Sequence, residues 1–112
     1  MSARNEEYVD VNDALSRIGG NLDLYKRLLG RFVDGDQLIT LETALKNGDP
    51  EESARAAHTL KGVAANLSLV KLRELSASLE QDLKAGLDYS AKLADLKETY
   101  DETIKVIAEI MS

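Results

Sequence analysis

The sequence predicts an all-α fold: an antiparallel four-helix bundle with a short N-terminal helix that caps one end. Three observations support this prediction. The 112 residues include only seven Gly and one Pro, while Leu and Ala are abundant. No alternating run rich in Val, Ile or Thr indicates a strand. Apolar residues instead recur at helical spacing, and the short segments between these stretches favour antiparallel neighbours.

A glycine-rich turn separates the first two expected helices. The first covers about Val11–Ile18 and ends at Gly19-Gly20-Asn21, where Asn21 is a suitable N-cap for a helix that begins near Leu22. The apolar stripe of this second segment changes direction by more than roughly 100° if the helix is unbroken. Because Asp34-Gly35-Asp36 lies where the direction changes, we expect a kink or short interruption there. The stripe consists of Leu24, Tyr25, Leu28, Leu29, Phe32, Leu38, Leu41 and Leu45.

The third long helix has a strong start signal. Lys46-Asn47-Gly48 ends the preceding segment, and Asp49 follows as an N-cap with Pro50 at the first helical position. The acids Glu51 and Glu52 then face the positive end of the helix. We therefore expect a helix from Pro50 onward.

Two further helices complete the expected bundle. Asn66-Leu67-Ser68 breaks the chain, and Ser68 is the expected N-cap of the next helix, which ends at Ala85-Gly86. A last helix begins at Tyr89-Ser90 and continues to about Met111. Both carry apolar stripes at helical spacing, namely Leu72, Leu75, Leu79 and Leu83, then Leu93, Leu96, Tyr100, Ile104, Ile107 and Met111.

Composition restricts the chemistry available to the chain. We expect a flexible segment over residues 1–8 and one bundle domain over residues 9–112. Without cysteine there is no disulfide or thiolate metal site, and one histidine excludes a multi-histidine site, so no metal is expected. There is neither a bilayer-spanning apolar run nor a signal-peptide pattern. The net charge of -6 argues against a nucleic-acid partner. Taken together, these features lead us to expect a small, acidic, cytoplasmic domain, and its charged surface favours a monomer.

The single histidine, His58, is expected to point to solvent. The core face of its helix is formed by Ala56, Leu60, Val63, Ala64 and Leu67. At about 100° per residue, His58 lies roughly 160° from the centre of that face. Its neighbours on the outer face are Ala54, Lys61, Gly62 and Ala65.

The side chains on this outer face are unusually small, and none of them is acidic. Exposed helix faces ordinarily carry long charged side chains, and a mid-helix glycine costs about 1 kcal/mol against alanine. No acid occurs between Glu52 and Glu74, whereas four basic residues do. They are Arg55, Lys61, Lys71 and Arg73. The pattern favours a site that holds or meets an anion.

Of the reactions considered for His58, accepting a phosphoryl group requires the fewest additional groups on this chain. A neutral exposed imidazole is nucleophilic, whereas a hydrolytic triad needs an orienting carboxylate and an oxyanion hole. No acid lies next to His58 in sequence, and zinc would need three or four ligands. Accepting a phosphoryl group needs an accessible nitrogen, a nearby positive charge and space for a partner. His58, Lys61 and Gly62 offer these three features.

The segment His58-Thr59-Leu60-Lys61-Gly62 resembles the His-x-x-Lys-Gly signature of histidine-containing phosphotransfer (HPt) domains of two-component phosphorelays. The flanking residues are similar as well, and the resemblance spans about Val9 to Leu83. These flanks are Ala56-Ala57, Val63-Ala64-Ala65-Asn66-Leu67, and Gly19-Gly20-Asn21-Leu22-Asp23-Leu24-Tyr25 leading into Leu28, Leu29 and Phe32. Many family members have glycine in place of Ser68, and the Asp34-Gly35-Asp36 interruption is less typical of the family.

The resemblance implies a phosphocarrier without catalytic activity of its own. His58 would accept a phosphoryl group, usually on its distal nitrogen, from a receiver-domain aspartate or a hybrid sensor histidine kinase. It would pass the group to the aspartate of another response-regulator receiver domain. Lys61 would help neutralise the phosphohistidine, and Gly62 would leave room for the phosphoryl group. The Mg²⁺ belongs to the receiver, so no cofactor is expected on this chain, and the expected docking rim is Ala54, Arg55 and Ala65.

Two other hypotheses remain open. The chain could be a helical adaptor or dimerisation bundle that uses its small-residue face for packing alone, which would make His58 incidental. It could also be an enzyme with His58 as a general base. That hypothesis needs a second titratable group in contact with His58, and we find none from the sequence.

Overall fold

The computed structural model describes residues 3–112, which form an all-α fold. Within this range the only β structure is an isolated bridge between Val9 and Leu69. The fold class predicted from the sequence is therefore confirmed. The helices are α1 (Ala3–Tyr8), α2 (Val11–Arg17), α3 (Leu22–Asp34), α4 (Gln37–Lys46), α5 (Pro50–Asn66), α6 (Val70–Ala85) and α7 (Ser90–Met111).

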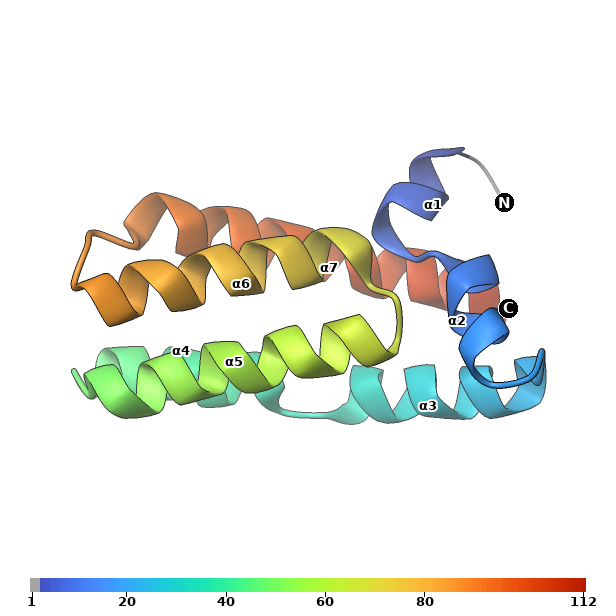
Figure 1. Cartoon of the computed structure of the whole chain (residues 1–112), viewed down its shortest axis with the longest axis horizontal. Coiled ribbons are helices and arrows are strands. Elements are labelled where there is room, and N and C mark those ends of the chain that lie inside the picture. Colours follow the sequence, from blue (N-terminus) through green and yellow to red (C-terminus); the bar gives the residue numbers. More distant parts are fainter. Residues whose placement is uncertain (1–2) are drawn as a thin grey trace.

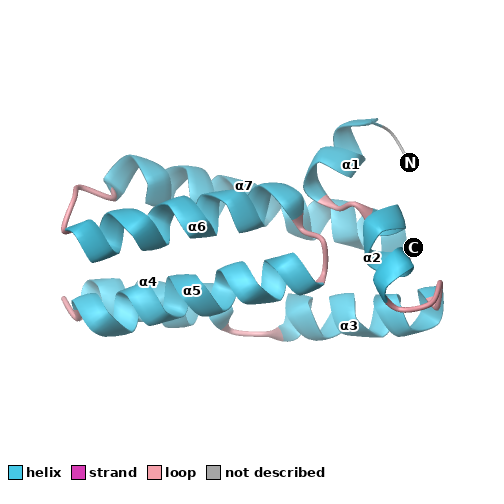
Figure 2. Cartoon of the chain, in the orientation of Figure 1, coloured by secondary structure: helices cyan, strands magenta, loops and turns pink. Residues whose placement is uncertain are grey.

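The long helices run antiparallel, with α5 and α6 side by side in one layer (Figure 1). Behind them, α3 and α4 follow one another along one side and α7 runs along the other, while α1 and α2 lie at the end that also holds the C-terminus. Short loops connect the helices (Figure 2). None of the helices described by the structure is long and apolar enough to cross a bilayer.

The core lies where the predicted apolar stripes meet. On α5, the residues Ala56, Leu60 and Ala64 are buried, as expected, and Ala57 is buried beside them. Each of the other long helices contributes a fully buried side chain to the same cluster, among them Leu29, Leu41, Leu72, Leu79, Leu96 and Ile107. Because burying one such side chain contributes about 1.5–3 kcal/mol, these stripes fix the rotation of each helix. The rotation of α5 in turn fixes the direction of its outer residues.

The expected interruption in the second long segment is confirmed. Helix α3 ends at Asp34 and α4 begins at Gln37. The Gln37 side chain donates to the backbone carbonyl of Phe32 at 2.8 Å, and so satisfies an acceptor at the helix end. It also lies 3.3 Å from the hydroxyl of Tyr100 on α7. The break lets the stripes of α3 and α4 both face the core.

Ser68 does not cap α6, so that prediction is wrong. The N-cap position belongs to Leu69, and no side chain bonds to the start of the helix. Ser68 has a φ of 56°, in the left-handed region that favours glycine, and its hydroxyl donates to Asp13 on α2 at 2.7 Å. That hydrogen bond is the largest cause of the lowered pKa of the Asp13 carboxyl. The serine therefore ties the α5–α6 turn to α2 instead of capping a helix.

The N-terminal region contains a helix that the sequence did not predict. Residues 3–8 form α1, where a flexible segment was expected over residues 1–8, and residues 1 and 2 lie outside the described range. The side chain of Asn5 donates to Glu109 on α7, and Lys71 on α6 lies 3.5 Å from Glu7. These contacts hold α1 against α6 and α7. A domain boundary at residue 9 stays a prediction.

Ser76→Ala is expected to raise the free energy of unfolding by about 1 kcal/mol. Ser76 on α6 is 0 % exposed, and its hydroxyl is the one buried side-chain polar atom without a hydrogen-bond partner in the described chain. Removing it leaves no partner unpaired and improves helix propensity. Chemical denaturation measures the change, with Ser53→Ala as a matched control.

Ser53 is also buried in a helix, but its hydroxyl donates to the carbonyl of Asp49 at 2.7 Å. Its removal should therefore give no comparable gain. Equal changes in the two variants would show that the unpaired hydroxyl of Ser76 carries no cost.

Candidate functional site

His58 lies on the outer face of α5, as the sequence predicted. The Asp49 carboxylate accepts from the backbone N–H of Glu52 at 3.1 Å, and Pro50 occupies the first turn, so the start of the helix is fixed. From that start, packing of Leu60 into the core turns His58 outward, and its side chain is 64 % exposed. The imidazole is therefore open to a partner molecule.

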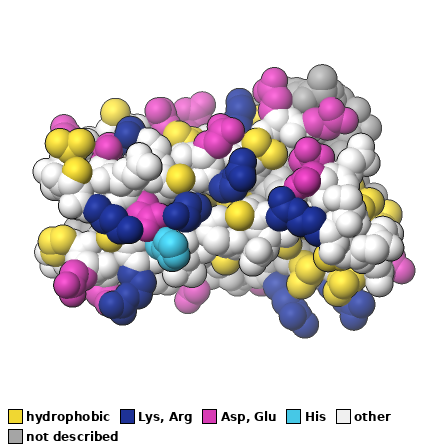
Figure 3. Space-filling view, in the orientation of Figure 1, with side chains coloured by type: hydrophobic (Ala, Val, Ile, Leu, Met, Phe, Trp, Pro, Cys, Tyr) yellow, Lys and Arg dark blue, Asp and Glu magenta, His cyan; other side chains and the backbone are white. Residues whose placement is uncertain are grey.

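Small residues surround the imidazole on α5. Ala54 and Ala65 are partly exposed, and Gly62 is exposed one turn after His58. A Cβ added at Gly62 would meet no atom within 4 Å, so nothing inside the described chain requires a glycine there. Figure 3 shows the histidine on an open surface with basic side chains on both sides. Space at Gly62 is thus available to a group that comes from outside.

A buried carboxylate from α6 contacts the histidine. The side chain of Glu80 is 6 % exposed, and its Oε2 lies 3.0 Å from His58 Nδ1. The expectation that no titratable group contacts His58 is therefore wrong. Glu80 could not be identified from the residues around His58, because it lies on a neighbouring helix, 22 residues further along the chain.

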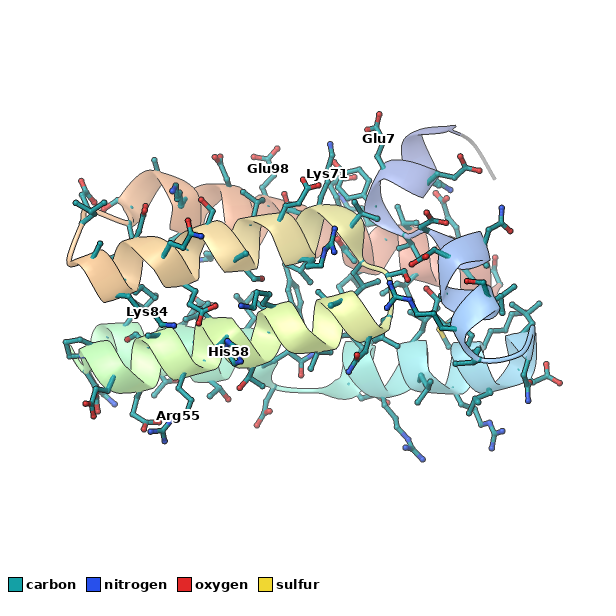
Figure 4. The ribbon with its side chains drawn as sticks, in the orientation of Figure 1. Glu7, Arg55, His58, Lys71, Lys84 and Glu98 are labelled. Carbon is teal, nitrogen blue, oxygen red and sulfur yellow. The ribbon has the colours of Figure 1, made fainter. Side chains whose placement is uncertain are left out.

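Two lysines also bind Glu80. Lys61 Nζ lies 2.8 Å from Oε1, and Lys84 Nζ lies 2.9 Å from Oε2. Lys61 comes from α5 and Lys84 from α6, so the carboxylate joins the two helices at the site. Figure 4 shows His58 on α5 and Lys84 reaching from α6 into the space beside it. Lys61 is therefore engaged with a buried acid and is not a free surface cation.

The contacts keep Glu80 ionised. Burial on its own raises the pKa of this carboxyl. Hydrogen bonds from Lys61, Lys84 and His58 outweigh burial and lower the pKa from 4.5 to about 2. Glu80 is thus a carboxylate at neutral pH and can only accept hydrogen bonds.

The ionised carboxylate determines which ring nitrogen of His58 carries hydrogen. Because Glu80 can only accept, Nδ1 must donate, and the lone pair of the neutral ring lies on Nε2. This nitrogen is the one farther from the backbone. The result is a nucleophilic nitrogen held outward by a bond on the opposite side of the ring.

Shallow depressions flank the histidine along the α5–α6 face. The first is lined by the expected rim residues Ala54 and Arg55 together with His58, Glu80 and Lys84. The second is lined by Lys61, Gly62 and the third rim residue, Ala65. Arg55 also pairs with Glu52 at 2.8 Å. The expected rim thus lies on both sides of His58.

A carboxylate–imidazole pair also occurs in hydrolases, where it acts on a hydroxyl or thiol nucleophile or stands beside a metal ion. None of the residues that line the depression at His58 is Ser, Thr, Cys or Tyr, so no hydroxyl or thiol nucleophile lines that depression. Between residues 3 and 112, no group of three or more His, Cys, Asp or Glu could hold a metal ion. The arrangement fits an imidazole that is itself the nucleophile.

Glu80→Gln is expected to reduce the acid sensitivity of folding. The folded-state pKa of about 2 lies below the ordinary 4.5, so the contribution of Glu80 is complete above pH 4.5 and is lost as the pH falls through 2. The variant should lack this dependence, which amounts to about 1–2 kcal/mol because the lysines are partly exposed.

Urea denaturation at several pH values between 2 and 7 measures the difference between wild type and variant. Glu74→Gln, at an exposed position of the same helix, is the matched control. A difference between wild type and Glu80→Gln that stays constant with pH would contradict the account.

Comparison with known proteins points to one family. Residues 34–107, about two thirds of the chain, match the family model described as Hpt domain. Searches of curated proteins and of solved structures gave no significant match. The matched range includes α5 and α6 and therefore His58, Lys61, Gly62 and Glu80.

Proposed function

The chain belongs to the Hpt domain family, whose members carry phosphoryl groups in phosphorelays, and on this premise we propose that His58 carries the phosphoryl group in this protein. The donor is a receiver-domain aspartate or a hybrid sensor histidine kinase, and the acceptor is the aspartate of another response-regulator receiver domain. The observation that carries this proposal is the exposed His58 ring, whose Nδ1 is bound by Glu80.

The proposed step transfers one phosphoryl group. The lone pair on His58 Nε2 attacks the phosphorus of a receiver aspartyl phosphate, and the bond from phosphorus to the aspartate oxygen breaks. The aspartate leaves as a carboxylate. Nδ1 keeps its hydrogen and its bond to Glu80, which stabilises the positive charge that develops on the ring. Onward transfer reverses these events with a second receiver.

The chain's contribution to the reaction is positioning and charge. The family consists of phosphocarriers, and we propose that this chain has no catalytic activity of its own and binds no cofactor. The receiver supplies the Mg²⁺ that the reaction needs. Ala54, Arg55 and Ala65 are proposed to border the docked receiver, because they line the depressions on either side of His58. Cytoplasmic location and a monomeric state stay predictions.

Transfer from a panel of phosphorylated receiver domains tests the proposal. At least one receiver should pass its radiolabelled phosphoryl group to the chain, and the label should be labile in acid and stable in alkali. If no receiver or histidine kinase transfers label, and binding to a receiver is unchanged in His58→Ala, the chain is a helical adaptor and the proposal is wrong.

Lys61→Ala is expected to slow transfer about tenfold while the fold stays intact. Removing one group that stabilises developing charge costs 100-fold or more in a closed site, and less here because Lys61 is 33 % exposed. Glu80 keeps Lys84 as a partner, so the bundle should unfold at nearly the same temperature. Rapid-quench transfer assays measure the rate.

Lys71→Ala is the control for Lys61→Ala, because Lys71 pairs instead with Glu7 on α1. It should transfer at the wild-type rate. If Lys61→Ala transferred the phosphoryl group at the wild-type rate, Lys61 would have no role in the proposed site.

A further inference from the structure

The two oxygens of Glu80 have different sets of partners. Oε1 binds Lys61 at 2.8 Å. Oε2 is shared by His58 Nδ1 at 3.0 Å and Lys84 Nζ at 2.9 Å. Lys61 can therefore leave Glu80 without breaking the bond that orients the imidazole, whereas Lys84 binds the same oxygen as the imidazole.

Phosphorylation changes the charge balance at this carboxylate. Before transfer, two lysines and one carboxylate give the cluster a net charge of +1. A phosphoryl group brings about two negative charges to the opposite side of the ring. Lys61 lies one turn after His58 on the same helix and is the cation placed to meet it. That movement removes one of the two cations from Glu80.

A carboxylate that is 6 % exposed cannot lose all its cations without cost. If Lys61 moves to the phosphoryl group, Lys84 is the cation that remains on Glu80 in the described structure. It would keep the carboxylate charged and keep Oε2 directed at Nδ1. Without Lys84, Lys61 would have to neutralise both Glu80 and the phosphoryl group.

We propose that Lys84 is a positioning residue that allows Lys61 to exchange Glu80 for the phosphoryl group. The proposal rests on the proposed function of His58 and adds a residue outside the His-x-x-Lys-Gly segment. Lys84 acts through Glu80, and its effect therefore does not require contact with a receiver domain.

The test measures the isolated phosphorylated chain. Wild type and Lys84→Ala are phosphorylated with a receiver domain or phosphoramidate, the donor is removed, and the half-life of the phosphohistidine is followed. Lys84→Ala should shorten the half-life about fivefold, the upper end for a surface ion pair, because its partner is buried. Lys84→Arg should restore it. Lys92→Ala is the matched control, because it removes an ion pair between Lys92 on α7 and Asp82 on α6, the helix that carries Lys84.

A double-mutant cycle with Glu80→Gln separates action through Glu80 from other roles. In the Glu80→Gln background, Lys84→Ala should change the half-life by less than about twofold, because the negative charge that Lys84 balances is absent. A persistent fivefold effect would overturn the proposal and indicate that Lys84 acts directly. If Glu80→Gln does not fold, the half-lives of the phosphohistidine in Lys84→Gln and Lys84→Arg are compared in the wild-type background. There, only the charged residue should preserve the half-life.

The outcomes distinguish this proposal from the proposed function. A wild-type half-life in Lys84→Ala would overturn the role of Lys84 while leaving His58 as the phosphoryl carrier. If no donor labels His58 in the wild-type chain, the proposed function is wrong, and so is the role of Lys84.

Discussion

His58→Gln is expected to abolish phosphoryl transfer to the chain, with at least a 100-fold loss of label. Glutamine has no nucleophilic ring nitrogen, but its amide can still donate to Glu80. Because His58 is exposed, the substitution creates no cavity in the core. The loss should therefore be chemical and not a result of unfolding.

The experiment compares wild type and His58→Gln with the same radiolabelled receiver. Circular dichroism and the midpoint of thermal unfolding verify that both chains are folded. Equal labelling of the two chains would show that another residue accepts the phosphoryl group, and the assignment of His58 would be wrong.

Gly62→Gln is expected to change stability and transfer in opposite directions. Glycine in a helix interior is about 0.5 kcal/mol less favourable than glutamine, and a Cβ at Gly62 would meet nothing within 4 Å, so the variant should unfold less readily. A long side chain one turn from His58 should hinder the approach of a receiver. Displacing reacting groups by about 1 Å can cost about 100-fold in rate, and we expect a loss of this order.

Gly62→Ala separates the two effects. The single methyl group should stabilise the chain by about 1 kcal/mol and reduce transfer less than glutamine does. Gly30→Ala is a matched control, because a Cβ added at this mid-helix glycine would lie 3.5 Å from the Met111 side chain, an ordinary van der Waals contact. Chemical denaturation and rapid-quench transfer assays measure stability and rate. Unchanged transfer in Gly62→Gln would show that the space beside His58 has no role.

The helices and the direction of His58 could be predicted because their signals are local. The caps at Asn21 and Asp49 accept hydrogen bonds from backbone groups three residues ahead, and Gly86 ends α6 in the left-handed conformation. The phase of α5 follows from its apolar residues, and it placed His58 outside. Local chemistry therefore determines both the helices and the outward direction of His58.

The parts that could not be predicted depend on contacts between helices. Glu80 follows the buried Leu79 on α6, and only the packing of α6 against α5 brings it to His58. The sequence contained one signal for this contact. Glu80 is an acidic residue at the edge of an apolar stripe, and it lies four residues before Lys84. Ser68 has the properties of an N-cap, but its bond to Asp13 on α2 overrides the local preference. The polar segment of α1 contacts residues of α6 and α7, and such contacts cannot be predicted from its own sequence.

The most direct test of the account is to locate the phosphoryl group on the ring. A chain labelled with ¹⁵N histidine is phosphorylated by a receiver, and the ring nitrogens of His58 are observed by NMR. The account predicts phosphorus on Nε2 and hydrogen on Nδ1, where Glu80 binds. Phosphorus on Nδ1, or transfer that leaves the ring unmodified, would contradict it.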